Sequence, residues 1–92
     1  MIVSFRCRDT KALFNLKRSR VWGSIERPAL RKLAQLDVAG TLDDLRVPPG
    51  NRLEPLSGNR KGQWSIRIND QFRLCFRWGP SGPEDVEIVD YH

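Results

Sequence analysis

The last three residues of the sequence bring together side chains that can move protons. His92 is the only histidine in the chain, and Asp90 and Tyr91 directly precede it. Histidine is the side chain that changes charge nearest to neutral pH, so it can serve as an acid or as a base. If this end of the chain is a strand, Asp90 and His92 share one phase and Tyr91 takes the other. A terminal histidine is also commonly frayed and idle, and that alternative stays open at this point.

Cleavage of RNA without a metal ion is the chemistry that these groups suit. A base takes the proton from the 2'-hydroxyl, cations stabilise the extra negative charge on the phosphate, and an acid protonates the leaving 5'-oxygen. We expect His92 to supply the acid or the base, Arg73 the charge stabilisation, and Asp90 the orientation of His92. Glu54 is a candidate for a second proton carrier. Its alternative role is an exposed carboxylate that pairs with a nearby arginine.

A β-hairpin over residues 62–78 must position Arg73. Apolar residues alternate from Trp64 to Ile68 and again from Phe72 to Trp78, and three polar residues, 69–71, separate the two runs. Period-2 alternation is typical of half-buried strands. Opposed residues of an antiparallel pair point to the same face, so the register pairs each apolar residue with another. The expected core pairs are Ile68 with Phe72, Ile66 with Leu74, and Trp64 with Phe76; those of the other face are Arg67 with Arg73, and Gln63 with Arg77.

The second face of this hairpin is therefore expected to be basic. Like charges that lie opposite each other on a sheet are unfavourable, so this face favours an anion bound across Arg67, Arg73 and Arg77. The alternative is a solvated face whose long side chains splay apart. The turn before the hairpin carries Arg60 and Lys61 among small residues, which suits contact with phosphate oxygens, although basic turns are usually just solvated. Arg52 completes the predicted RNA-binding set.

The remaining elements predict an α+β domain with two N-terminal helices packed on one face of a mostly antiparallel sheet. Residues 2–7 alternate as a first strand, and a helix over 10–17 follows, capped by Asp9 or Thr10. A second helix is expected from Ser24 to Gly40, with a capping pair, Thr41 and Asp44, for one further turn. The segment 48–50, Pro-Pro-Gly, is expected to end all helical structure. Pro55 restricts any strand near it to an edge, and residues 86–92 are expected to form a central strand.

Length and composition predict one small basic domain that spans residues 1–92. The 92 residues include 16 Lys and Arg against 11 Asp and Glu, a formal charge of +5, which favours nucleic acid or an acidic protein as partner. The apolar runs are too short for a membrane helix, and residues 1–8 lack the apolar core of a secretory signal. Cys7 and Cys75 are expected to be free thiols in a reducing compartment. No nucleotide-binding loop, metal-ligand cluster or cofactor motif is present.

Several short motifs, taken in order along the whole chain, resemble those of the HigB toxins in the RelE-like superfamily. They are I-x-S-F at 2–5, L-x-x-L-D-x-A at 33–39, R-L-x-P-L-x-G at 52–58, G-x-W-S-I at 62–66, F-R-L-x-F at 72–76 and the closing D-Y-H. The wording P-P-G-N-R-L and V-E-I-V-D-Y-H is most similar to the GraT-type branch. Each motif is weak alone, but their order and spacing make the resemblance specific.

The resemblance implies a small cytoplasmic bacterial toxin with a microbial RNase-like fold. It implies metal-independent cutting of messenger RNA in the decoding site of the small ribosomal subunit, and neutralisation by a HigA-type helix-turn-helix antitoxin, through which alone DNA is bound. The family's functional positions fall here on Arg73, Asp90, Tyr91 and His92, and Arg60 with its neighbours is implied to contact ribosomal or messenger RNA.

One departure from the family pattern concerns the base. Many relatives carry a histidine and a lysine in R-L-H-P-L-K-G, whereas this chain has Glu54 and Ser57 at those places. Either Glu54 acts as a base in a desolvated site, or the chain is a slower nuclease. Two rival functions follow: a non-catalytic module that binds RNA or the ribosome, and the toxin-side subunit of an autorepressor complex.

Overall fold

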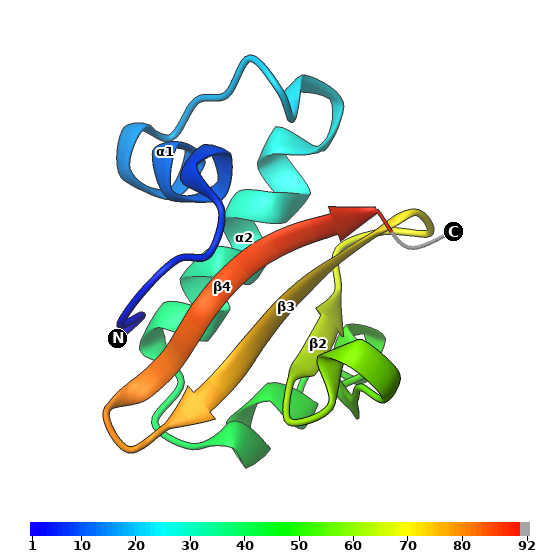
Figure 1. Cartoon of the computed structure of the whole chain (residues 1–92). Coiled ribbons are helices and arrows are strands. Elements are labelled where there is room, and N and C mark those ends of the chain that lie inside the picture. The colour runs from blue at the N-terminus through cyan, green and yellow to red at the C-terminus, as the bar shows by residue number, and fades with distance from the viewer. Residues whose placement is uncertain (91–92) are drawn as a thin grey trace.

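A computed structural model describes residues 1–90 as two α-helices and a four-stranded antiparallel sheet, which confirms the predicted α+β class (Figure 1). The helices are α1 (Arg8–Leu16) and α2 (Glu26–Val38). The strands are β1 (Glu54–Pro55), β2 (Trp64–Arg67), β3 (Phe72–Gly79) and β4 (Gly82–Asp90), and they lie in the order β1-β2-β3-β4. Four short 3-10 helices complete the described elements: η1 (Gly23–Ile25), η2 (Leu42–Arg46), η3 (Pro49–Asn51) and η4 (Gly58–Arg60).

The hairpin of β2 and β3 has the predicted register. Ile66 lies opposite Leu74, Trp64 opposite Phe76, and Arg67 opposite Arg73. The Asn69 side chain closes the three-residue turn, because its Oδ1 accepts the N–H groups of Gln71 at 2.9 Å and Phe72 at 2.8 Å. An Asn side chain that bonds the backbone two residues ahead is a common way to fix such a turn. β2 begins at Trp64, so the expected pair of Gln63 with Arg77 falls outside the ladder.

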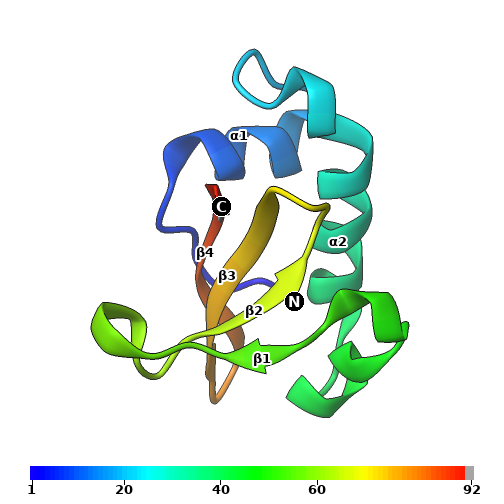
Figure 2. The ribbon, with the colours of Figure 1, turned by 90° about the vertical axis from the view of Figure 1, so that its right-hand side faces the viewer.

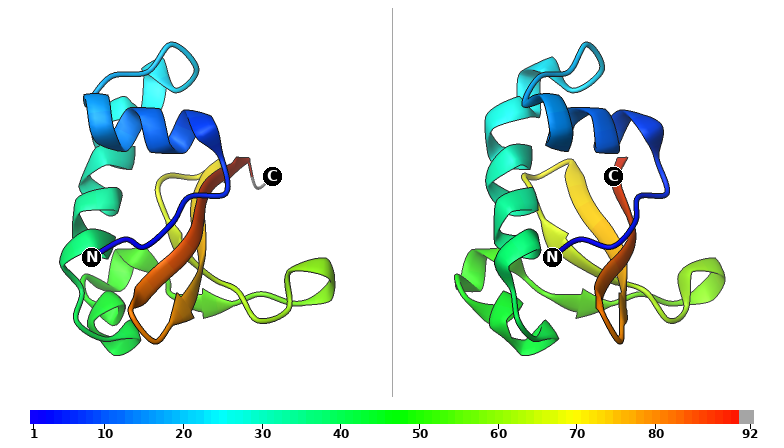
Figure 3. Two further views of the ribbon diagram at one scale, coloured as in Figure 1. Left: turned by 60° about the vertical axis from the view of Figure 1, so that its left-hand side comes forward. Right: turned by 90° about the vertical axis from the view of Figure 1, so that its left-hand side faces the viewer.

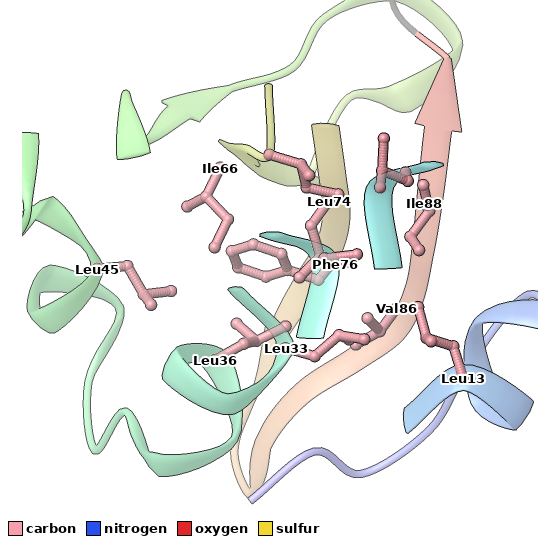
Figure 4. Packing of buried hydrophobic residues seen from close by; sticks show 12 residues of the cluster. Leu13, Leu33, Leu36, Leu45, Ile66, Leu74, Phe76, Val86 and Ile88 are labelled. Carbon is pink, nitrogen blue, oxygen red and sulfur yellow. The ribbon is translucent and has the colours of Figure 1, made fainter. Parts of the chain in front are cut away.

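Both helices cover the same face of the sheet and share one apolar core with it (Figures 2 and 4). α1 contributes Leu13, and α2 contributes Ala29, Leu33 and Leu36; all four side chains are fully buried. The sheet side of this core is Ile66, Leu74, Phe76, Val86 and Ile88. This is the arrangement predicted from the alternation of the strands and the apolar stripes of the helices.

The prediction of an N-terminal strand at residues 2–7 is wrong. Only Phe5 forms a β-bridge, and it pairs in parallel with Val86. α1 already begins at Arg8, two residues before the predicted start, after an extended Cys7. The predicted cap residue Thr10 instead lies inside the helix and is buried, where its hydroxyl accepts the N–H of Ile88 at 3.1 Å. Thr10 is thus buried because of a long-range hydrogen bond to β4. Its local preference for helix caps gives no indication of this contact.

The prediction that the last strand is central in the sheet is also wrong. β4 starts at Gly82 and lies at the edge of the hydrogen-bonded sheet, next to β3. Residues 3–6 cover its outer side through a few backbone hydrogen bonds, such as Arg6 N–H to the Val86 carbonyl at 3.0 Å. This cover pairs the free edge of β4. Val86 and Ile88 face the core, and Val89, opposite Arg73 on the other face, is the half-buried residue that breaks the phase.

The connection between α2 and the sheet was partly predicted. Thr41 and Asp44 form the expected capping box at the start of η2, and β1 is the expected short edge strand at Pro55. The prediction that helical structure ends at 48–50 is wrong, because Pro49 begins the 3-10 helix η3, where its fixed φ is favourable. Asn51, at the end of that turn, is buried: its amide donates to the Leu45 carbonyl at 3.1 Å, and its oxygen accepts from Lys32 at 2.6 Å.

Candidate active site on the open face of the sheet

The open face of the sheet is the face turned away from α2, and adjacent strands build it in rows. The first row runs Glu54, Ser65, Cys75, Glu87, each opposite the next in the strand register. The second row runs Arg67, Arg73, Val89. Their neighbours Ile66, Leu74 and Ile88 point into the core, so alternation places these rows on the other side. The loop between β1 and β2, residues 56–63, here called the excursion, extends beyond this face (Figures 2 and 3).

Arg73 is buried at the centre of the second row and is held by three groups. Its Nε donates to the Ser65 hydroxyl at 2.8 Å, and its Nη2 donates to the Arg52 carbonyl at 2.7 Å. Glu54 Oε1 lies 3.4 Å from the same Nη2, and the Arg73 side chain is only 11% exposed. A guanidinium fixed in this way is preorganised for bidentate binding of an oxyanion, because little side-chain freedom remains to be lost.

Glu54 lies at the edge of the site, on β1, and pairs with Arg73. Its side chain is 53% exposed, so it borders solvent on one side and the buried arginine on the other. The sequence left two roles open, and the structure places the carboxylate where either is feasible. It is an ion-pair partner of Arg73 in the structure, and it stands beside the position that a phosphate on Arg73 would take.

Carboxylates of the chain itself pair with the arginines of the open face, a feature that the sequence did not predict. Binding of an external anion by these arginines stays a prediction. Arg67 pairs with Asp70 of the adjacent turn, and Arg77 lies 3.6 Å from Asp85 of β4. Arg60 lies in the loop before β2, and its Nη1 donates to Glu87 Oε1 at 2.7 Å. These pairs relieve the repulsion between opposed arginines, and they arise between loops and strands that the alternation pattern does not connect.

Asp90 does not share the open face with Arg73. It lies opposite Phe72, on the phase that faces the helices, whereas Val89 lies opposite Arg73. Its Oδ2 accepts a hydrogen bond from Gln71 Nε2 at 3.0 Å. The side chain therefore belongs to the β2–β3 turn end of β4 rather than to the row of arginines. Tyr91 and His92 lie outside the described residues, so their expected roles stay predictions.

The remaining predicted RNA contacts lie around the same face. Arg52 is exposed, has a left-handed backbone (φ 47°), and supplies the carbonyl that holds Arg73. Lys61 is exposed in the excursion after η4. Next to it Gly62, at φ 94°, comes so close to the Arg77 guanidinium that an added Cβ would lie 2.8 Å from Nη1. The excursion and the arginines of the sheet thus form one continuous surface.

Sequence reasoning missed the groups that hold the site together. Ser65 and Glu87 were not candidates, although the predicted register already put Ser65 on the open face, diagonal to Arg73. Cys75 is buried in the first row, and burial raises the pKa of its thiol to about 11 against the opposing influence of Arg60. The thiol therefore stays protonated at neutral pH and is no nucleophile. Cys7 and Cys75 are both free thiols, as expected.

Residues 1–90 contain neither a metal-binding cluster nor a membrane-spanning helix. No group of three His, Cys, Asp or Glu side chains gathers there in a way that holds a metal ion. Within the same range, no helix combines the length and apolar character needed to cross a membrane.

Comparison with known proteins decides the family. A family model described as RelE-like toxin of type II toxin-antitoxin system HigB matches residues 4–92. The chain belongs to this HigB-like toxin family. Over 55 residues it is 58% identical to Toxin HigB-1 of Vibrio cholerae, an alignment that covers 60% of this chain and 58% of that protein. The matched part thus spans well under two thirds of this relative's length, while the family model covers nearly the whole chain.

Two solved structures are similar in fold. A single-substitution variant of YafQ from E. coli has a TM-score of 0.64 at 12% identity and covers 98% of this chain and 91% of its own. A YoeB/ParE toxin from Agrobacterium tumefaciens has a TM-score of 0.57 at 20% identity and covers 99% and 98%. The resemblance to HigB toxins and the RelE-like fold are thereby confirmed.

Proposed function

We propose that this HigB-like toxin is a ribosome-dependent endoribonuclease that cleaves messenger RNA without a metal ion and so inhibits translation. It acts in the cytoplasm on messages bound to the small ribosomal subunit. A HigA-type helix-turn-helix antitoxin neutralises it, and DNA is bound only through that antitoxin. The observation that carries the proposal is the buried Arg73, held by Ser65 and the Arg52 carbonyl and open toward Glu54.

Arg73 is assigned to the phosphate at which the RNA is cut. An oxygen of this phosphate displaces the Glu54 carboxylate from Arg73, because arginine binds phosphate through two parallel hydrogen bonds. The guanidinium then stabilises the extra negative charge that develops as the 2'-oxygen attacks phosphorus. Arg52, Arg60, Lys61, Arg67 and Arg77 are assigned to the neighbouring phosphates of the RNA.

Glu54 and His92 are assigned to the two proton transfers. After the phosphate has displaced Glu54 from Arg73, the Glu54 carboxylate lies beside the phosphate. It takes the proton of the 2'-hydroxyl as the 2'-oxygen forms its bond to phosphorus. The bond to the 5'-oxygen then breaks, and His92 donates the proton that leaves with this oxygen. The products are a 2',3'-cyclic phosphate and a 5'-hydroxyl. Asp90 and Tyr91 are assigned to the orientation of His92 and of the RNA beside it.

The experiment is mapping of 5' ends on a message bound to purified ribosomes that are kept intact with magnesium. We expect the wild-type protein to generate new 5'-hydroxyl ends, and Arg73→Ala and deletion of His92 to abolish them. Glu54→Gln keeps the shape of the side chain but cannot accept the proton, so it should slow cleavage strongly. Unchanged cleavage in Arg73→Ala and in the His92 deletion would refute the residue assignment.

A non-catalytic ribosome-binding module is the second candidate, and the four ion pairs on the open face favour it. A site whose cations are already neutralised can bind RNA weakly without activating a phosphate. In that case the wild-type protein would bind ribosomes with a steep salt dependence and produce no new 5' ends. A chain that neither cuts RNA nor binds ribosomes alone would instead be the toxin-side subunit of an autorepressor complex.

A further inference from the structure

The net positive charge of the chain belongs to the helical half and not to the sheet. Residues 1–40 carry nine Lys and Arg against three Asp and Glu, whereas residues 41–92 carry seven against eight. All five ion pairs found among residues 1–90 lie between residues 43 and 87. Within that described range the cations of α1, α2 and their connection form no ion pair. The helical half is therefore a positive surface that the chain does not neutralise.

A groove lies in this surface between α1 and the segment 17–22 that connects it to α2. Its volume is about 710 Å³. Its apolar lining is Ala12, Leu16 and Val21, of which Leu16 is 71% and Val21 55% exposed. Arg18 and Arg20 flank these aliphatic side chains. The connecting segment lies at the opposite end of the molecule from β1, so the groove is remote from Glu54 (Figure 3).

The groove is preformed, because hydrogen bonds fix the segment that borders it. The Ser19 hydroxyl accepts the N–H groups of Val21 and Trp22, both at 3.0 Å. The Glu26 carboxylate accepts the Ser19 N–H at 3.2 Å, and Glu26 also lies in the first turn of α2, where the helix dipole favours an anion. Asp9 occupies the same place in α1. Glu26 thus has a hydrogen-bond partner within the fold, and Asp9 lies at a helix start that favours an anion. Because the segment is already ordered, binding here costs little ordering of the chain.

We propose that this groove binds an acidic amphipathic segment of the antitoxin, with aliphatic side chains over Leu16 and Val21 and carboxylates paired to Arg18 and Arg20. This inference rests on the proposed function to the extent that the partner is the antitoxin. Two apolar side chains exposed between unpaired cations complement a segment of that composition. Single-stranded RNA fits less well, because it stacks its bases on exposed aromatic rings and the lining here is aliphatic.

The test is calorimetric measurement of antitoxin affinity for four variants of the full toxin. Leu16→Asp places a charge in the apolar lining, and Arg18→Glu with Arg20→Glu reverses the flanking charge. The matched controls lie outside the groove: Val38→Asp changes a residue of α2 that is 81% exposed, and Arg27→Glu with Arg31→Glu reverses two exposed cations of α2. All these side chains are at the surface, and thermal unfolding of each variant checks that the fold is intact.

We expect both groove variants to raise the dissociation constant of the antitoxin by at least about tenfold, and both controls to change it by less than about threefold. Equal effects of groove and control variants would overturn the inference. So would an unchanged antitoxin affinity together with weaker ribosome binding of Arg18→Glu with Arg20→Glu, because the groove would then bind RNA. Cleavage by the wild-type toxin without antitoxin is measured separately, so failure of the nuclease assignment is distinguishable from failure of the groove.

Discussion

The helical and sheet halves of the molecule use their cations in opposite ways. On the open face of the sheet, Arg60, Arg67, Arg73 and Arg77 each pair with a carboxylate of the same chain. Among residues 1–90, the cations of the helical half have no such ion pairs. Pairing fixes a guanidinium in one geometry and removes its net charge, whereas an unpaired surface cation keeps its charge and its mobility. Under the functions proposed above, the sheet would position one phosphate and the helices would attract an acidic partner from a distance.

The comparison is tested most strongly by removing one arginine from each half. Arg73→Ala should lower the rate of message cleavage by about 100- to 1,000-fold, because it removes a fixed donor to the developing charge. Arg31→Ala, in the exposed face of α2, should leave the rate within about twofold. Primer extension on ribosome-bound message gives both rates. Comparable losses in the two variants would mean that the burial of Arg73 has no special role.

Ser65→Ala tests whether pairing fixes the geometry of Arg73. The variant removes the oxygen that accepts Arg73 Nε and leaves a buried donor unsatisfied, at a cost of about 1–3 kcal/mol in the free energy of unfolding. Cleavage should fall mainly through kcat, with a smaller change in KM, because the charge stays but its orientation is lost. Ser57→Ala, at an exposed position, is the control. A purely structural role would instead lower stability and leave kcat of the folded protein unchanged.

Glu87→Gln should make the open face of the sheet more positive by one charge. The substitution removes the carboxylate that neutralises Arg60 and keeps the size of the side chain. We expect RNA to bind roughly three- to tenfold more tightly, with a steeper dependence on salt, because one more charge faces the backbone of the RNA. Glu84→Gln, also on β4, is the control. Filter binding at two salt concentrations measures the difference.

The smallest effect is expected from acid, at the capping box of η2. Backbone hydrogen bonds from Thr41 and Gly40 lower the pKa of Asp44 below its ordinary value. The folded state therefore binds this proton less readily than the unfolded state. The stabilisation is complete above the ordinary pKa of an aspartate and is lost as the pH falls through the lowered value. Asp44→Asn should lower Tm slightly at neutral pH and make Tm less sensitive to acid. Asp43→Asn, one residue away, should not.

Local and periodic features of the fold were predictable from the sequence. The alternation around residues 69–71 predicted the hairpin and its register, and Thr41 with Asp44 predicted a capped turn. The edge position of β4 was not predictable, because it depends on contacts of Phe5 and Thr10 with residues about 80 positions away. Apolar residues on both phases are typical of a central strand, but here Val89 lies half-buried on the open face of an edge strand.

The candidate site was predictable for its side chains that follow the strand register and not for the others. The alternation placed Arg73 on the open phase, and the structure agrees. Its partners come from a backbone carbonyl at Arg52 and from the separate strand of Glu54, which no periodicity reveals. The expected role of Asp90, to orient His92, stays a prediction, because His92 lies outside the described residues. Strand alternation itself puts Asp90 on the other phase, opposite Phe72.

The bridge between Phe5 and Val86 has a consequence for the synthesis of the toxin. The Ser4 hydroxyl accepts the Asp85 N–H across a separation of 81 residues, so the beginning of the chain is held by a strand that is translated near its end. Contacts between residues so far apart in the sequence form late and slowly during folding. A nascent chain that still lacks β4 has no complete core and no ordered row of arginines. The core of this fold is therefore completed only after β4 has been synthesised.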